Sequence, residues 1–314
     1  MGIRLYQETE LKNPMMLCGW PGIGNIGILA VDTLRGMLKA EEFGEIEPWD
    51  FFDPRRVSIR NGLLEHLEFP DNKFYFQRTE NRDLLFFIGE EQPAEGGTRY
   101  AEGKKAYQMA NLVLDVAEKS GCQKVYTSGA AVTQIHHTLK PRVWAVTNTQ
   151  KLLDEVKGYR NTILMSEIEG GDGQGSITGL NGLLLGVAKE RGIDAICLMG
   201  EIPYYLHGAP WPYPKASKSV LEVFSEILGM KIDLSQFDEL IGKVEKNIEE
   251  FLENFYKAET IPLEVRDKFR DEIEKLKYVR PTKPEPTTEE VTERIMEHIN
   301  ELFKKGSKAD ERPH

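Results

Sequence analysis

The chain has 314 residues, of which 40% are hydrophobic and 29% are charged, and its formal net charge is −11. A chain of this length can bury a large core, and this composition excludes a wholly disordered protein. The negative charge argues against nucleic acid or an anionic membrane surface as the main partner, because both attract basic proteins.

Short apolar runs alternate with helix-like segments over most of the chain. The runs predict strands at residues 15–18, 84–88, 124–127, 142–147, 162–165 and 195–199. Apolar spacing predicts helices at residues 27–38, 100–120, 177–191 and 217–228, and residues 55–77 indicate antiparallel strands at one edge. This alternation is typical of an α/β fold with a mostly parallel sheet flanked by helices, which we assign to residues 1–234.

Glycine becomes rare after residue 230, where long charged segments begin. Ser235 suits the cap of one helix, and Pro262 suits the first position of a second helix. The apolar residues of the two helices form one stripe each: Phe237, Leu240, Ile241, Val244, Ile248, Phe251, Leu252 and Phe255, then Val265, Phe269, Ile273 and Leu276. We therefore predict a C-terminal helical extension over residues 235–280.

Residues 281–314 form the last predicted unit. Residues 281–286 alternate proline with polar residues and predict a semi-rigid linker, and Thr287 with Glu290 forms a capping box for a final helix. Its apolar stripe is Val291, Ile295, Ile299, Leu302 and Phe303. A single helix is marginal in water, so this stripe needs the chain's own core, a second copy or another protein to cover it. Residues 304–314 form a polar tail.

We expect a soluble, cytoplasmic protein without a cofactor. Residues 1–10 lack the pattern of a secretory signal, and the apolar stretch at residues 179–188 is too short to span a membrane. Cys18, Cys122 and Cys197 are widely spaced within apolar runs. This spacing predicts buried, reduced thiols and neither a disulfide framework nor a metal site.

The turn between the first strand and the first helix carries the most distinctive motif. It contains Gly19, Trp20, Pro21, Gly22, Gly24 and Gly27. The last three glycines match G-x-G-x-x-G, which in this context binds a dinucleotide phosphate in some proteins. The Trp-Pro pair makes this turn bulky and rigid, and Glu41 and Glu42 follow what looks like a helix end. We therefore favour a tight packing turn over a cofactor loop.

Other polar groups could serve an active site, but they do not complete one. The glycine-rich loop at residues 170–175 could cradle a phosphate, although it lacks the lysine of a P-loop. Glu90, Glu91 and Glu201 are predicted at strand ends, where the ligand crevice of an α/β sheet lies. His136 and His137 lie in a loop, and their spacing matches no metal-binding motif. We therefore expect no enzymatic activity.

The proline-rich loop at residues 207–214 contains Trp211 and Tyr213. Large aromatic residues are favoured as anchors of protein interfaces. These two side chains could therefore form a recognition surface, or could pack the loop onto the domain. We therefore treat Trp211 and Tyr213 as candidate interaction residues, together with the apolar stripe of the final helix.

Taken together and in order, these motifs resemble the proteasome-assembly-chaperone family, and its archaeal branch in particular. The resemblance rests on residues 19–27, 84–90, 128–130, 170–185 and 214–216, and it covers residues 10–235. It implies a fold similar to that of nucleoside phosphorylases without their catalytic groups. It also implies ATP-independent assistance to the assembly of proteasome α-subunits by a homo-oligomer.

The sequence departs from the resemblance at one place. Some relatives end in a hydrophobic residue, a tyrosine and a final residue, which insert into the proteasome α-ring, whereas this chain ends in residues 309–314 without that pattern. We predict a non-enzymatic chaperone or scaffold that forms a tetramer or pentamer. The alternative is a nucleotide- or nucleoside-binding enzyme that uses the Gly22-to-Gly27 turn and the loop at residues 170–175.

Overall fold

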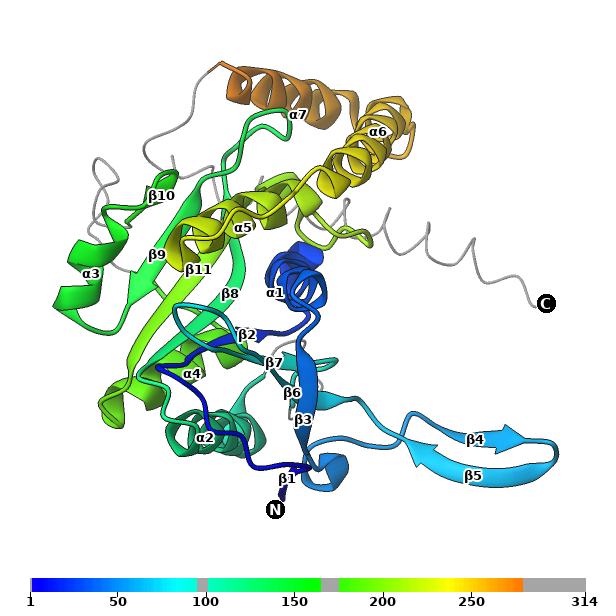
Figure 1. Cartoon of the computed structure of the whole chain (residues 1–314). Coiled ribbons are helices and arrows are strands. Elements are labelled where there is room, and N and C mark those ends of the chain that lie inside the picture. The colour runs from blue at the N-terminus through cyan, green and yellow to red at the C-terminus, as the bar shows by residue number, and fades with distance from the viewer. Residues whose placement is uncertain (1, 95–100, 165–174, 279–314) are drawn as a thin grey trace.

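The computed structural model describes residues 2–94, 101–164 and 175–278 (Figure 1). Within these residues, one sheet contains nine strands in the order β1-β3-β6-β7-β2-β8-β11-β9-β10. The strands are β1 (Ile3–Leu5), β2 (Met15–Gly19), β3 (Glu41–Ile46), β6 (Asn72–Gln77), β7 (Leu84–Gly89), β8 (Lys124–Thr133), β9 (Val143–Thr147), β10 (Thr162–Ile163) and β11 (Asp194–Pro203). Strands β4 (Arg56–Arg60) and β5 (Leu63–Glu68) form a separate two-stranded sheet.

Helices cover both faces of the large sheet. One face carries α1 (Ile26–Met37), α3 (Gln150–Val156) and α5 (Pro214–Leu228), and the other carries α2 (Gly103–Lys119) and α4 (Gly179–Glu190) (Figure 1). The helices α6 (Gln236–Lys257) and α7 (Leu263–Leu276) pack beyond α5. Three short 3₁₀ segments connect these elements: η1 (Ile23–Asn25), η2 (Pro48–Asp50) and η4 (Tyr204–Leu206).

The two faces of the sheet define two hydrophobic clusters. In β2, Met15 and Leu17 point into the cluster with α1 and α5, whereas Met16 and Cys18 point into the cluster with α2 and α4. Successive strand residues point to opposite faces, so a strand covered on both sides must be apolar throughout. This explains the continuous apolar runs that predicted the central strands.

The expected mostly parallel sheet is in fact mixed. The central pairs β7–β2, β2–β8 and β8–β11 are parallel, as is β9–β10. The pairs β1–β3, β3–β6, β6–β7 and β11–β9 are antiparallel. The chain runs from β8 to β9 through residues 134–142, which form no helix. A parallel return needs a longer crossover, so β9 runs in the opposite direction.

Of two predictions near element ends, one was confirmed and one was wrong. Glu41 and Glu42 follow the end of α1, as expected, because Lys39 adopts a left-handed φ of 55° that stops the helix, and these two residues open β3. Phe43 and Ile46 then bury their side chains. By contrast, β11 continues to Pro203, so Glu201 lies within a strand and not after it.

The C-terminal helical extension is present, and most residues of the predicted stripes are buried, although Leu240 is 43% exposed. The buried residues are Phe237, Val244, Ile248, Phe251, Leu252 and Phe255 on α6, and Phe269, Ile273 and Leu276 on α7. They belong to the same cluster as α5 and the sheet. Ser235 has helical dihedral angles and no capping hydrogen bond from its side chain, and Pro262 precedes α7. The division at residues 234 and 280 stays a prediction, and the predicted linker, final helix and tail at residues 281–314 lie outside the described residues.

Across the described ranges, none of the helices combines the length and the apolar character that a membrane crossing requires.

Candidate functional site

The glycine turn after β2 is packed against the body of the protein. Gly24 adopts a left-handed φ of 58°, and a Cβ atom at this position would lie 2.9 Å from Cδ1 of Ile202 and 3.1 Å from Cβ of Tyr213. The backbone N–H of Tyr213 donates to the Gly24 carbonyl at 2.7 Å. The turn therefore meets β11 and the loop before α5 directly, which leaves no room for a phosphate on that side.

The start of α1 lies equally close to β8. A Cβ atom at Gly27 would lie 2.0 Å from the carbonyl oxygen of Ser128. The side-chain amide of Asn181, from α4, donates to the same oxygen at 3.1 Å. Only glycine allows this approach. Close packing thus explains the second and third glycines of the G-x-G-x-x-G pattern.

Gln92 occupies the strand-end crevice of the sheet. Its side-chain N–H donates to the Pro21 carbonyl at 2.7 Å, and its carbonyl accepts from the backbone N–H of Leu180 at 3.0 Å. Leu180 lies in the first turn of α4, where free N–H groups would bind an anion. Trp20 is also buried, with its ring edge-on to Phe87 at 5.7 Å between centroids. Gln92 therefore takes up the backbone N–H of Leu180 that an anion would otherwise need at this helix end.

The predicted carboxylates are held by arginines. Arg55 binds Glu90 at 2.9 Å and Glu91 at 2.6 Å. The fully buried Glu201 accepts from the Arg142 guanidinium at 2.8 Å and from the Trp144 indole at 3.1 Å. Burial alone would raise the pKa of Glu201, but the hydrogen bonds from Arg142 and Trp144 lower it below its usual value. An ionised, paired carboxylate of this kind is a poor general base.

His136, His137 and the three cysteines are buried within the protein. The rings of His136 and His137 lie 4.1 Å apart, and Nδ1 of His137 is 2.8 Å from the Tyr205 hydroxyl. Burial lowers the pKa of His136 to about 4 and that of His137 to about 3, so both rings are neutral at pH 7. Burial also holds the pKa of Cys18 well above its usual value, so it is no ready nucleophile. Among the residues that the structure describes, no cluster of His, Cys, Asp and Glu could hold a metal.

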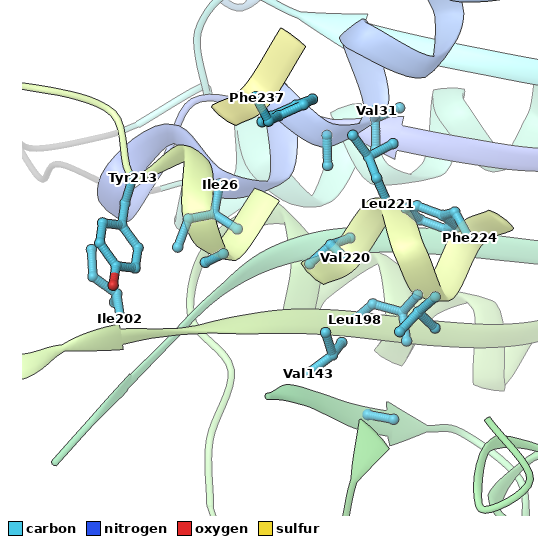
Figure 2. Packing of buried hydrophobic residues seen from close by; sticks show 14 of the residues in the cluster. Ile26, Val31, Val143, Leu198, Ile202, Tyr213, Val220, Leu221, Phe224 and Phe237 are labelled. Atoms are coloured by element: carbon cyan, nitrogen blue, oxygen red, sulfur yellow. The ribbon is translucent and has the colours of Figure 1, made fainter. Parts of the chain in front are cut away.

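The predicted aromatic surface is divided. Tyr213 is only 2% exposed and packs in the core beside Ile26 and Ile202, so its assignment to an interaction surface was wrong (Figure 2). Trp211 is half-buried, and its ring centroid lies 6.4 Å from that of Phe251 in α6. Both side chains attach the loop before α5 to the chain's own body. The remaining candidates, Val291, Ile295, Ile299, Leu302 and Phe303, lie outside the described residues.

The strongest candidate surface is the β4–β5 arm, residues 56–68, which sequence reasoning treated only as edge strands. This arm projects away from the nine-stranded sheet (Figure 1). Its turn residues Asn61 and Gly62 have φ values of 53° and 78°, which is the geometry that an Asn-Gly hairpin turn requires. Asn-Gly between two alternating segments was the available signal for this hairpin.

One face of the arm is aliphatic and exposed. The cross-strand pairs are Val57 with Leu67 and Ile59 with Leu64. Their exposed fractions are 40% and 44% for the first pair, and 69% and 70% for the second. Exposed aliphatic patches are common at sites of protein–protein contact. The arrangement therefore suits binding a macromolecule better than it suits chemistry on a small ligand.

Comparisons with known proteins give a family match, a relative and similar solved structures. The model of the PAC2 family matches residues 16–252. An uncharacterized protein of Methanocaldococcus jannaschii is 30% identical over 271 residues, which are 86% of this chain and 93% of the relative. The crystal structure of Pyrococcus furiosus PbaB, described as an archaeal proteasome activator, has 30% identity and a TM-score of 0.65, and covers 79% of this chain and 97% of its own.

A second archaeal structure shows the same fold at lower identity. Pyrococcus furiosus PbaA, described as an archaeal homolog of proteasome-assembly chaperone, is 20% identical, with a TM-score of 0.58 over 86% of this chain and 100% of its own. The family match thus begins in β2 and ends within α6.

Proposed function

This chain belongs to the PAC2 family, and on that premise we propose that it is a non-enzymatic, ATP-independent assembly chaperone or scaffold acting on proteasome subunits. It works in the cytoplasm as a homo-oligomer of four or five copies. The observation that carries the proposal is the contrast between a glycine turn that packs tightly against β8 and β11 and a projecting arm with an exposed aliphatic face. The relatives PbaB and PbaA, described as a proteasome activator and as a homolog of an assembly chaperone, support the choice of client.

The rival function is a nucleotide- or nucleoside-binding enzyme. Its first element, the Gly22-to-Gly27 turn, packs against β8 and β11 at Gly24 and Gly27. Its second element, the loop at residues 170–175, lies almost entirely outside the described residues. Its proposed bases, Glu90 and Glu201, are both paired with arginines. These contacts favour the chaperone proposal, and the expected likeness to nucleoside phosphorylases concerns the fold alone.

The C-terminal segment has a separate place in the proposal. The amphipathic stripe from Val291 to Phe303 provides a further contact, either within the oligomer or with the client. Removal of residues 281–314 should weaken oligomer or client binding, and native mass spectra unchanged by the deletion would refute that role.

The decisive experiment is native mass spectrometry of the full chain, alone and mixed with proteasome α-subunits from the same source. We expect a discrete homo-oligomer that takes up α-subunits without added ATP. A homo-oligomer that ignores α-subunits would refute the proposed client. A thermal-shift panel of nucleosides, nucleotides and dinucleotides tests the rival, since a ligand that binds only the native state must raise its melting temperature.

A further inference from the structure

We infer that the aliphatic face of the β4–β5 arm is the contact between two copies of this chain, packed face to face about a two-fold axis. The inference deepens the proposed function, since it names the surface through which the proposed homo-oligomer forms. It rests on the two faces of the arm, on its charge and on its projection from the body.

The arm is amphipathic because strand residues alternate between faces. Val57, Ile59, Leu64 and Leu67 share one face, as their cross-strand pairing shows. The adjacent Leu63 pairs with Arg60 on the opposite face. A register shift between Val57 and Ile59 keeps the aliphatic residues of both strands together on one side.

The opposite face satisfies its own polar groups. Arg56 forms an ion pair with Glu68, and Arg60 binds Glu65 at 3.1 Å. The Ser58 hydroxyl lies 3.5 Å from a Glu65 carboxylate oxygen. These contacts run across the two strands, so this face needs no partner. The opposite face thus carries ion pairs and the single exposed Leu63, whereas the aliphatic face carries four exposed apolar side chains.

A two-stranded hairpin is marginally stable by itself in water. At the base of the arm lies a hollow with a mixed lining, in which Leu67, Trp49 and Phe69 lie beside charged residues such as Arg55, Glu68 and Glu90. The Trp49 and Phe69 rings lie 4.6 Å apart, and Trp49 is 65% exposed. A molecule that packs on the arm therefore meets the four aliphatic side chains of the arm and, at its base, the exposed Trp49 ring beside charged groups.

The chemistry of this face fits a second copy better than a client. Permanent subunit contacts are more hydrophobic than transient ones, and the central face here consists only of Val, Ile and Leu. Two copies with a net charge of −11 repel each other. In the arm, two arginines balance two glutamates, so the arm is locally neutral. Because the arm projects, two arms can meet while the acidic bodies stay apart (Figure 1).

A face that binds itself makes an isologous contact, so the oligomer must contain an even number of copies. Of the two proposed assemblies, this selects the tetramer over a five-membered ring. In a tetramer with two-fold axes, the arm supplies one kind of contact and another surface supplies the second.

The test is a matched pair of substitutions at neighbouring leucines. Leu64 and Leu63 are 70% and 73% exposed and lie on opposite faces, so neither change disturbs the core. Leu64→Glu would place an unpaired carboxylate in the contact and should raise the dissociation constant at least about 100-fold, whereas Leu63→Glu should leave it unchanged. Native mass spectrometry and light scattering across a dilution series measure the assembly, and circular dichroism checks the fold.

Cysteine crosslinking gives an independent readout. The three native cysteines are buried, so an introduced surface cysteine is the accessible thiol. With a mild oxidant, Ile59→Cys should form a covalent dimer, and Ser58→Cys on the other face should not. The inference fails if Leu64→Glu keeps the parent mass, if the native oligomer is five-membered or monomeric, or if Ser58→Cys crosslinks as well as Ile59→Cys.

The same samples separate this inference from the proposed function. If the parent oligomer depends on Leu64 but takes up no α-subunits, the proposed client is refuted and the arm contact between two copies is supported. If Leu64→Glu keeps the oligomer but loses α-subunit uptake, the arm binds the client and the inference is overturned.

Discussion

Replacing Gly27 with alanine tests whether the glycine motif exists for packing. The added Cβ would lie 2.0 Å from the Ser128 carbonyl oxygen and 2.5 Å from its carbon, whereas ordinary contacts lie at 3.4–4 Å. Neither atom can rotate away, because both belong to the backbone of the central strand β8. Helix α1 must therefore move by more than an ångström, which disturbs the packing of Ile26, Ala30 and Val31 in the core.

We expect Gly27→Ala to reduce the free energy of unfolding by about 3 kcal/mol, the upper end of the usual cost of overpacking. Gly22→Ala is the matched control. Gly22 has an extended backbone, with φ of −162° and ψ of −163°, and an added Cβ would meet nothing within 4 Å. Alanine there should be neutral or should stabilise by up to about 1 kcal/mol, since it restricts the unfolded chain.

Urea denaturation followed by circular dichroism measures both effects, at one protein concentration for all variants because oligomers unfold in a concentration-dependent way. A Gly27→Ala protein as stable as the parent would refute the packing argument. Equal losses of stability in the two variants would also refute it. Alanine at Gly22 meets no neighbouring atom, so an equal loss there could not come from a packing clash.

Three further predictions concern buried groups. Arg142→Ala should cost about 3 kcal/mol at pH 7, because it leaves the buried Glu201 carboxylate without its cation; urea midpoints measure this. The pKa of Glu201 is lowered below 4.5, so the stability that this pair contributes should be present above pH 4.5 and lost as pH falls through the folded pKa. An acid titration in which the difference in unfolding free energy between parent and variant widens would contradict the assignment. The three cysteines should resist a thiol reagent at pH 8 until denaturant is added, and rapid labelling of the native protein would show that they are accessible. Phe269→Ala should lower the free energy of unfolding by about 3–5 kcal/mol, because the Phe269 ring centroid lies 4.6 Å from that of Phe255 in the core between α6 and α7. A fall in melting temperature of less than a few degrees would contradict that packing.

Much of the secondary structure follows from local sequence. The segment from β2 to α1 and the stripe of α6 were predicted almost to the residue, because strand alternation and helical periodicity leave direct patterns in the sequence. The Asn61-Gly62 turn is also local, and the sequence contained its signal. What the sequence reasoning missed there was that the hairpin stands apart from the sheet.

The candidate site was harder to predict, because burial depends on residues distant in the chain. Tyr213 looked like a surface aromatic until Gly24 and Ile202 were placed beside it. Glu201 looked like a free strand-end acid until β9 brought Arg142 and Trp144 against it. A single sequence does not state which distant segments meet, and each of these pairings decides whether a polar or aromatic group is available.

By itself, the sequence determined the α/β class, the central apolar strands, the helical extension and the family, because these depend on periodicity and on short motifs read in order. Only the tertiary structure decided the direction of β9, the hydrogen bonds from Gln92 to Pro21 and Leu180, and the projection of the β4–β5 arm. The physical reason is that hydrogen-bond periodicity acts between near neighbours, whereas strand pairing, burial and exposure arise from contacts between segments that the chain brings together only on folding.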